Sequence, residues 1–119
     1  MSDIQIIVNQ TSNWLRFRNY ENSAHNLSLG PQSAAHFEWR PGVPWCTSQN
    51  EFDSGKKMEF EGPGIGASSW FLYERWGQLR VFRNGYEVGA SPPGFPRASG
   101  NQLRIYIGPG TNDFKMLQW

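Results

Sequence analysis

Short runs in which apolar and polar residues alternate recur along the chain, and glycine, proline or a polar cluster ends each run. The clearest run covers residues 103–107, where Leu103, Ile105 and Ile107 alternate with Arg104 and Tyr106. Alternation with a period of two places every second side chain on one face of a β-strand. No segment keeps a helical period over about two turns. The pattern therefore predicts an all-β fold, either an antiparallel β-sandwich or a small β-barrel of about eight to ten short strands.

Two turns are expected to close hairpins. Polar residues 9–13 separate the runs at 4–8 and 15–17, which we expect to pair as an opening hairpin. Asn84-Gly85 is typical of a type I′ turn, because both residues tolerate positive φ, and that turn would pair Val81 with Val88. We expect an ordered loop at residues 45–55 and a surface loop at the proline-rich residues 91–96. The other expected strands cover residues 27–29, 36–39, 57–61, 69–74, 79–81 and 114–119.

The alternation also predicts which side chains form the core. Apolar residues on one face of each expected strand should be buried together between the sheets. These residues are Ile4, Ile6, Val8, Leu15, Phe17, Phe37, Trp39, Met58, Phe60, Leu72, Leu79, Val81, Leu103, Ile105 and Ile107.

Length and cysteine content define the type of chain. Its 119 residues are the usual size of one domain, so we expect a single β domain over residues 1–119. Cys46 is the only cysteine, so an internal disulfide cannot form, and we expect its thiol to be a small buried hydrophobe. The first residues lack the pattern of a secretory signal, and no stretch has the apolar length of a membrane helix. These features predict a cytoplasmic protein.

Residues that could support catalysis do not form a known constellation. His25 and His36 belong to no zinc-ligand spacing, so we predict no metal site. The glycine-rich residues 62–66 include a proline, which lacks the N–H group that a phosphate cradle needs. Glu59 and Glu61 share one strand face, and paired acids can hydrolyse glycosidic bonds, but such acids more often keep a strand edge solvated. We therefore expect no cofactor and no enzymatic activity, and a small hydrolase ranks last.

Tryptophans in predicted turns carry the main functional signal. The chain has 6 Trp, 4 Tyr and 8 Phe, and most of them should pack in the core. Trp45 and Trp76 instead lie in expected loops, together with Asn50, Asp53 and Arg75. An indole can stack on the apolar C–H face of a sugar, while amide, carboxylate and guanidinium groups bond its hydroxyls. We predict a non-enzymatic, lectin-like carbohydrate-binding module with these five residues as its ligand site, provided that both loops meet at one end of the fold.

Arginines at alternating positions support a second hypothesis. Arg16, Arg18, Arg80, Arg83 and Arg104 could gather on one outward sheet face beside aromatic residues. Such a face would suit a protein-interaction or assembly component, an oligomer, or contact with a membrane surface through glycans or lipid headgroups. A formal net charge of +1 argues against nucleic acid as the partner. In size, β content and tryptophan number, the chain resembles small lectins and membrane-binding β-sandwiches of microbes and fungi; this architectural resemblance carries over no site residues.

Overall fold

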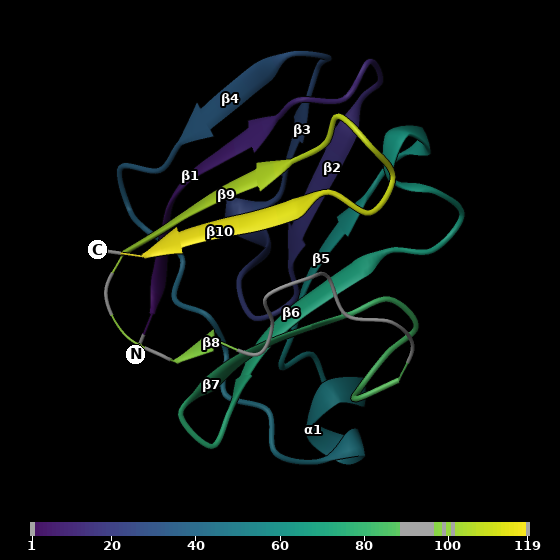
Figure 1. Cartoon of the computed structure of the whole chain (residues 1–119). Helices are drawn as coiled ribbons and strands as arrows, with labels where there is room; N and C mark the ends of the chain where they lie inside the picture. Colours follow the sequence, from purple (N-terminus) through teal and green to yellow (C-terminus); the bar gives the residue numbers. More distant parts are fainter. Residues whose placement is uncertain (1, 89–96, 99, 101, 119) are drawn as a thin grey trace.

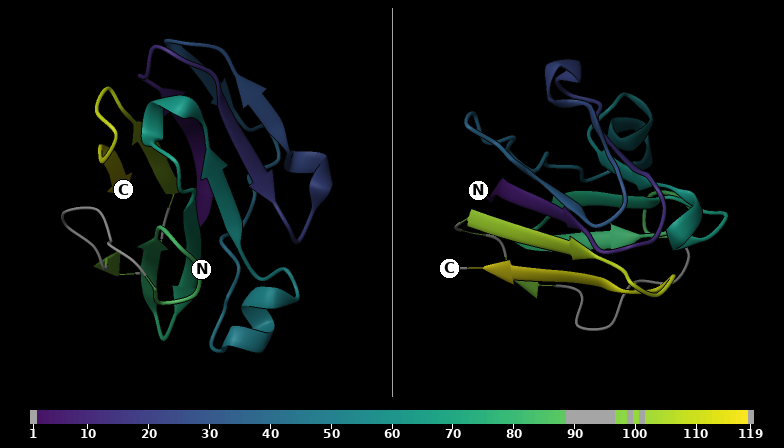
Figure 2. Two further views of the ribbon diagram at one scale, coloured as in Figure 1. Left: turned by 90° about the vertical axis from the view of Figure 1, so that its right-hand side faces the viewer. Right: turned by 90° about the horizontal axis from the view of Figure 1, so that it is seen from above.

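Two open β-sheets pack face to face in the computed structural model, which describes residues 2–88, 97–98, 100 and 102–118 (Figure 1). The four-stranded sheet has the order β10-β9-β1-β4, and the six-stranded sheet has the order β3-β2-β5-β6-β7-β8. The two further views in Figure 2 show the sheets as two layers. The strands are β1 (Asp3–Asn9), β2 (Leu15–Asn19), β3 (Leu27–Leu29), β4 (Ser33–His36), β5 (Met58–Glu61), β6 (Trp70–Arg75), β7 (Gln78–Phe82), β8 (Arg97–Ala98), β9 (Gln102–Ile107) and β10 (Phe114–Gln118). The predicted all-β sandwich is confirmed.

The first two strands do not form the expected hairpin, because β1 and β2 belong to different sheets. Residues 10–14 carry the chain from one sheet to the other, and side-chain hydrogen bonds fix this connection. The buried Asn9 donates hydrogen bonds of 2.9 Å to the carbonyl oxygens of both Asn13 and Gly30. Its own side-chain oxygen accepts from the hydroxyl of Thr11 at 2.7 Å. These bonds hold the crossing in place.

One strand pair also departs from the antiparallel expectation. β1 pairs with β9 in parallel, whereas β1 with β4 and β9 with β10 are antiparallel. Parallel neighbours need a long connection, and here most of the chain separates the two strands. No local turn therefore fixes their relative direction.

Most of the predicted core is buried between the sheets, together with several residues that alternation did not mark. Leu103, Ile105 and Ile107 are fully buried, as predicted. The buried apolar cluster between the sheets comprises Ile4, Ile7, Leu15, Phe17, Leu29, Val43, Met58, Phe60, Ile65, Trp70, Leu72, Leu79, Val81, Leu103, Ile105, Ile107, Phe114 and Met116, with Phe37 partly buried against it.

Three predicted core residues lie elsewhere. The register of β1 against β9 shifts between Ile4 and Ile6, so Ile7 takes the core position and Ile6 and Val8 are only half-buried. This irregularity reverses the alternation that the sequence shows. Trp39 lies beyond the end of β4 and is 81% exposed, so its assignment to the core was wrong.

The Asn84-Gly85 hairpin is also corrected. Val81 pairs with Leu72 in β6, and Val88 forms an isolated bridge with Gly85. β7 therefore ends at Phe82, and the following residues fold back locally instead of starting a paired strand. The expected loop at residues 91–96 lies outside the described residues.

A second, smaller cluster covers the outer face of the six-stranded sheet. The expected loop at residues 45–55 contains the short helix α1 (Gln49–Asp53), which Ser48 caps by accepting a hydrogen bond from the backbone N–H of Glu51. Phe52 of this helix packs with the buried Cys46 and Tyr73. Burial raises the pKa of the Cys46 thiol, as expected for a packing residue. Within the part of the chain that the structure describes, no helix is long and apolar enough to cross a bilayer.

Candidate functional site

The two loops that carry the predicted site tryptophans meet at the end of β6. Trp45 forms a parallel β-bridge with Glu74, and two backbone hydrogen bonds of 2.8 Å flank it, from Cys46 to Glu74 and from Glu74 to Pro44. Arg75 is the last residue of β6, and Trp76 follows it in the turn to β7. We call the group of Trp45, Arg75 and Trp76 the tryptophan end.

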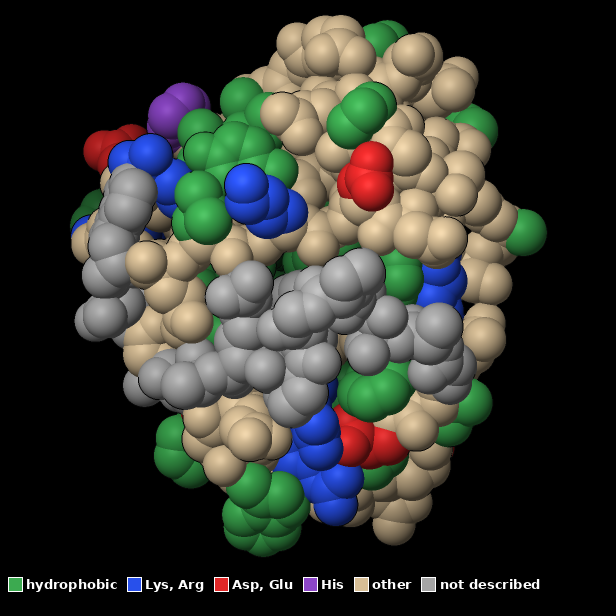
Figure 3. All heavy atoms as spheres, in the orientation of Figure 1, with side chains coloured by type: hydrophobic (Ala, Val, Ile, Leu, Met, Phe, Trp, Pro, Cys, Tyr) green, Lys and Arg blue, Asp and Glu red, His purple; other side chains and the backbone are tan. Residues whose placement is uncertain are grey.

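Both indoles of the tryptophan end face solvent. Trp45 is 64% exposed and Trp76 is 77% exposed. In Figure 3, hydrophobic side chains lie at the lower edge of the molecule, over the β6–β7 turn, beside basic and acidic side chains. Trp76 also has a φ of 51°, in the left-handed region that bulky residues rarely adopt. Neither packing nor backbone preference therefore explains a tryptophan at this position.

A carboxylate shared with Arg80 holds the side chain of Arg75 in place. The Oε1 atom of Glu87 lies 2.8 Å from a guanidinium nitrogen of Arg75 and 3.1 Å from one of Arg80. The Tyr73 hydroxyl donates to the other carboxylate oxygen of Glu87, and the Glu87 backbone N–H donates to that hydroxyl at 2.8 Å. The hydrogen bond to Glu87 raises the pKa of Arg75. Arg75, Arg80 and Glu87 together have two positive charges and one negative charge, so this group carries a net positive charge.

The other two predicted site residues do not join the tryptophan end. Asn50 and Asp53 lie on α1, which Figures 1 and 2 show apart from the β6–β7 turn. Both side chains are exposed, and the carboxylate of Asp53 accepts a 2.9 Å hydrogen bond from Gln49 on the same helix. The structure therefore groups three of the five predicted residues.

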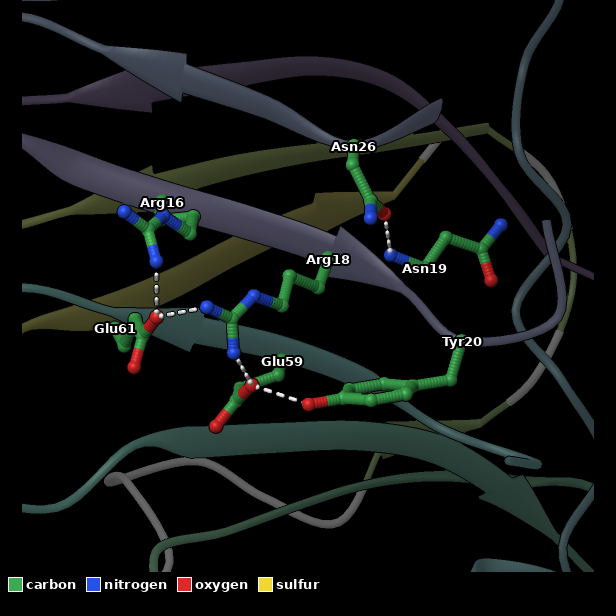
Figure 4. Close-up of polar contacts among 7 residues, drawn as sticks. All are labelled: Arg16, Arg18, Asn19, Tyr20, Asn26, Glu59 and Glu61. Carbon is green, nitrogen blue, oxygen red and sulfur yellow. Dashed lines mark hydrogen bonds and ion pairs between the residues drawn. The ribbon is translucent and has the colours of Figure 1, made fainter. Parts of the chain in front are cut away.

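A second polar group lies on the outer face of the six-stranded sheet, and sequence reasoning named its arginines and its glutamates separately without bringing them together. Arg18 contacts two carboxylates of β5, at 3.3 Å from Glu59 and 3.0 Å from Glu61 (Figure 4). Arg16 lies 3.3 Å from Glu61, and the Tyr20 hydroxyl donates to Glu59 at 2.8 Å. We call Arg16, Arg18, Glu59 and Glu61 the arginine–glutamate face. Its charges balance.

Two hollows border the Arg16–Glu61 ion pair, because Arg16 lines one and Glu61 lines the other. One has a volume of about 280 Å³ and is lined by Arg16, Arg18, Asn26, Leu27 and Ser28. The other has a volume of about 320 Å³, and its lining includes Trp14, Glu61, Gly62 and Ser68. Trp14 is 46% exposed, and its ring centroid lies 5.5 Å from the guanidinium carbon of Arg16. The hollows thus combine an indole with planar polar groups.

The five arginines of the second hypothesis do not form one basic face. Arg16 and Arg18 face Glu59 and Glu61, while Arg80 contacts Glu87. Arg83 donates to backbone carbonyl groups of two loops, and Arg104 lies on β9 in the other sheet. Alternation correctly places Arg16 and Arg18 on one strand face, but only strand pairing shows which acids they meet.

No family model matches the chain, and no curated protein or solved structure matches it significantly. Among the residues that the structure describes, no three His, Cys, Asp or Glu side chains group as metal ligands.

Proposed function

We propose that the protein is a non-enzymatic carbohydrate-binding module whose ligand stacks on the tryptophan end. The bridge between Trp45 and Glu74 carries this proposal, because it joins the backbones of the two segments that supply exposed indoles, next to Arg75 in the chain. A sugar ring offers an apolar C–H face for an indole, and its hydroxyls accept hydrogen bonds from a guanidinium. Loops held by a rigid sheet commonly carry binding residues.

Two energetic observations support a binding role for Trp76. A large apolar side chain in contact with water gains little from folding, so its exposure favours an interaction role. A bulky residue in the left-handed region adds roughly 1 to 3 kcal/mol of strain. Glu87, which anchors Arg75, also has a left-handed φ of 54°. Such conformations concentrate at ligand-binding and catalytic sites.

The carboxylates of the arginine–glutamate face favour binding over hydrolysis. A glycosidase needs one carboxyl group that keeps its proton, so that it can protonate the leaving group. Arg18 instead forms ion pairs with both Glu59 and Glu61, so both carboxyl groups are already occupied. This arrangement supports a module that binds sugars without cleaving them.

Glycan-array binding followed by titration of isolated ligands tests the proposal. We expect Trp76→Ala to weaken binding of the best ligand by roughly 1 to 3 kcal/mol, taking base–aromatic stacking as the nearest scale. Trp45→Ala should act in the same direction. Trp39→Ala is the matched control, because Trp39 is equally exposed but lies beyond β4. The proposal fails if the wild type binds no glycan, or if Trp76→Ala and Trp39→Ala have the same effect.

Protein assembly is the second candidate function, since tryptophan and arginine are common anchors of protein interfaces. The exposure of Trp39, Trp45 and Trp76 favours it, because a partner protein would cover these indoles. Analytical ultracentrifugation separates the two candidates: a particle of 13.6 kDa, the mass of one chain, favours the glycan-binding monomer. A larger particle that dissociates in Trp76→Ala favours assembly.

A further inference from the structure

We infer a second, independent carbohydrate site at the arginine–glutamate face, which takes an uncharged glycan of at least two sugar units. The inference does not depend on the tryptophan end. It rests on the two hollows, on the charge balance between them and on the indole of Trp14 at one side.

The position of the hollows indicates the length of the ligand. Arg16 lines one hollow and Glu61 lines the other, so their 3.3 Å ion pair joins the walls of the two hollows. A ligand that fills both hollows needs two rings joined by a linkage that passes over this ion pair. A single sugar ring would fill one hollow only, so it should bind more weakly.

The charges of the face indicate an uncharged ligand. Two guanidiniums and two carboxylates contact one another, so no net charge attracts an anionic group. The side chains that form these pairs still have free donor and acceptor positions, because Arg16 keeps 44% and Glu61 28% of its side chain exposed. The tryptophan end differs here, since Arg75 and Arg80 share one carboxylate. The two sites should therefore prefer different ligands.

Trp14 supplies the apolar surface of the second site. The turn after β5 approaches its backbone closely: a Cβ atom at Gly62 would lie 2.4 Å from the carbonyl oxygen of Trp14. Glycine at this position lets the two segments meet and form one wall of the hollow. The indole remains half-exposed beside Arg16, which suits stacking against a sugar ring.

Nuclear magnetic resonance can localise the binding, because each tryptophan indole N–H gives its own signal. The ligands are single sugars, neutral disaccharides and longer neutral chains, and sulfated counterparts of those chains. We expect neutral chains to shift the Trp14 signal and to bind roughly tenfold more tightly than single sugars. The buried Trp70 serves as the internal reference signal. The inference is overturned if no neutral chain shifts the Trp14 signal, or if single sugars or sulfated chains bind this face as tightly.

Two variants test the roles of the indole and of the charge balance. Trp14→Ala should weaken neutral chains at least about tenfold, whereas Trp76→Ala and Trp39→Ala should leave binding at this face unchanged. Glu61→Gln leaves two guanidiniums with one carboxylate, so affinity should fall for neutral chains and rise for sulfated ones. Unchanged selectivity in Glu61→Gln would overturn the inference even if Trp14→Ala failed to fold. If Trp14→Ala lost all glycan binding and Trp76→Ala kept the binding of the wild type, the result would support this site and reject the tryptophan end.

Discussion

The guanidinium carbon of Arg83 lies 3.9 Å from the centroid of the Trp70 ring, inside the edge of the sandwich. The same side chain donates to the carbonyl oxygen of Ser68 at 2.8 Å and to the side-chain oxygen of Asn112 at 2.8 Å. It also donates to the backbone carbonyl of Ile65. One arginine therefore connects the loop before β6 in one sheet with the turn before β10 in the other.

Replacement of Arg83 should destabilise the fold even when the positive charge is kept. Arg83→Lys loses the planar fork that reaches several acceptors at once, and we expect a loss of about 2 to 4 kcal/mol in the free energy of unfolding. Urea denaturation followed by tryptophan fluorescence measures this loss. Arg40→Lys is the matched control at an exposed position, and it should change stability by less than about 0.5 kcal/mol. Equal effects of the two variants would show that the Arg83 contacts are weak.

Neighbouring isoleucines in β1 offer a direct test of the register shift. Ile7 is fully buried and pairs with Ile105, whereas Ile6 pairs with Arg104 on the outer face. Ile7→Ala should cost roughly 2 to 5 kcal/mol, as should Ile105→Ala, because each leaves a cavity in the core. Ile6→Ala should cost less than half as much. Thermal or urea unfolding of the three variants measures these losses. A larger loss of stability in Ile6→Ala than in Ile7→Ala would contradict the register shift in β1.

This register shift shows where sequence reasoning about the fold reached its limit. Period-two alternation located β5, β7, β9 and β10 and most of the core, and a run that is apolar on both faces located β6. Alternation failed in β1, where the apolar pair Ile6 and Ile7 is compatible with either face, and one irregular residue reverses the alternation. It also failed at Trp39, because an indole two residues after Phe37 fits the alternation of a strand, whereas β4 ends at His36.

Long-range pairing limited the prediction of the site in the same way. Local composition identified Trp45 and Trp76 as residues in loops, and both are exposed. The sequence does not show that Trp45 bridges Glu74, because the two residues are far apart in the chain and no local turn joins them. Asn50 was included because it follows Trp45 closely along the chain, but the helical turn of α1 carries it elsewhere. The ion pairs of Arg18 with Glu59 and Glu61 likewise depend on the pairing of β2 with β5, which the sequence does not reveal.

The stability of the protein should fall at alkaline pH through Tyr73. Burial and the hydrogen bond to Glu87 raise the pKa of Tyr73 above its ordinary value. Above about pH 10 the unfolded chain loses this proton while the native chain keeps it, so the free energy of unfolding decreases as pH rises. Tyr73→Phe has no such proton. It should be less stable than wild type near neutral pH, by roughly 1 to 3 kcal/mol, and the gap should narrow above about pH 10.

Urea unfolding across this pH range measures the gap between wild type and Tyr73→Phe. Tyr106→Phe is the control, because Tyr106 lies on β9 in the other sheet. A gap that stays constant up to about pH 11 would mean that the Tyr73 proton is not linked to folding.

The strained backbone at Trp76 predicts that stability and binding respond in opposite directions. Asparagine tolerates the left-handed region better than tryptophan, so Trp76→Asn should relieve strain and raise the free energy of unfolding by about 1 kcal/mol. Trp76→Ala removes the same exposed indole but keeps a Cβ atom in that region, so its stability should remain near that of wild type. Both variants should lose glycan affinity. Urea unfolding and glycan titration of the pair test this, and a marked loss of stability in Trp76→Asn would show that the indole is a packing residue.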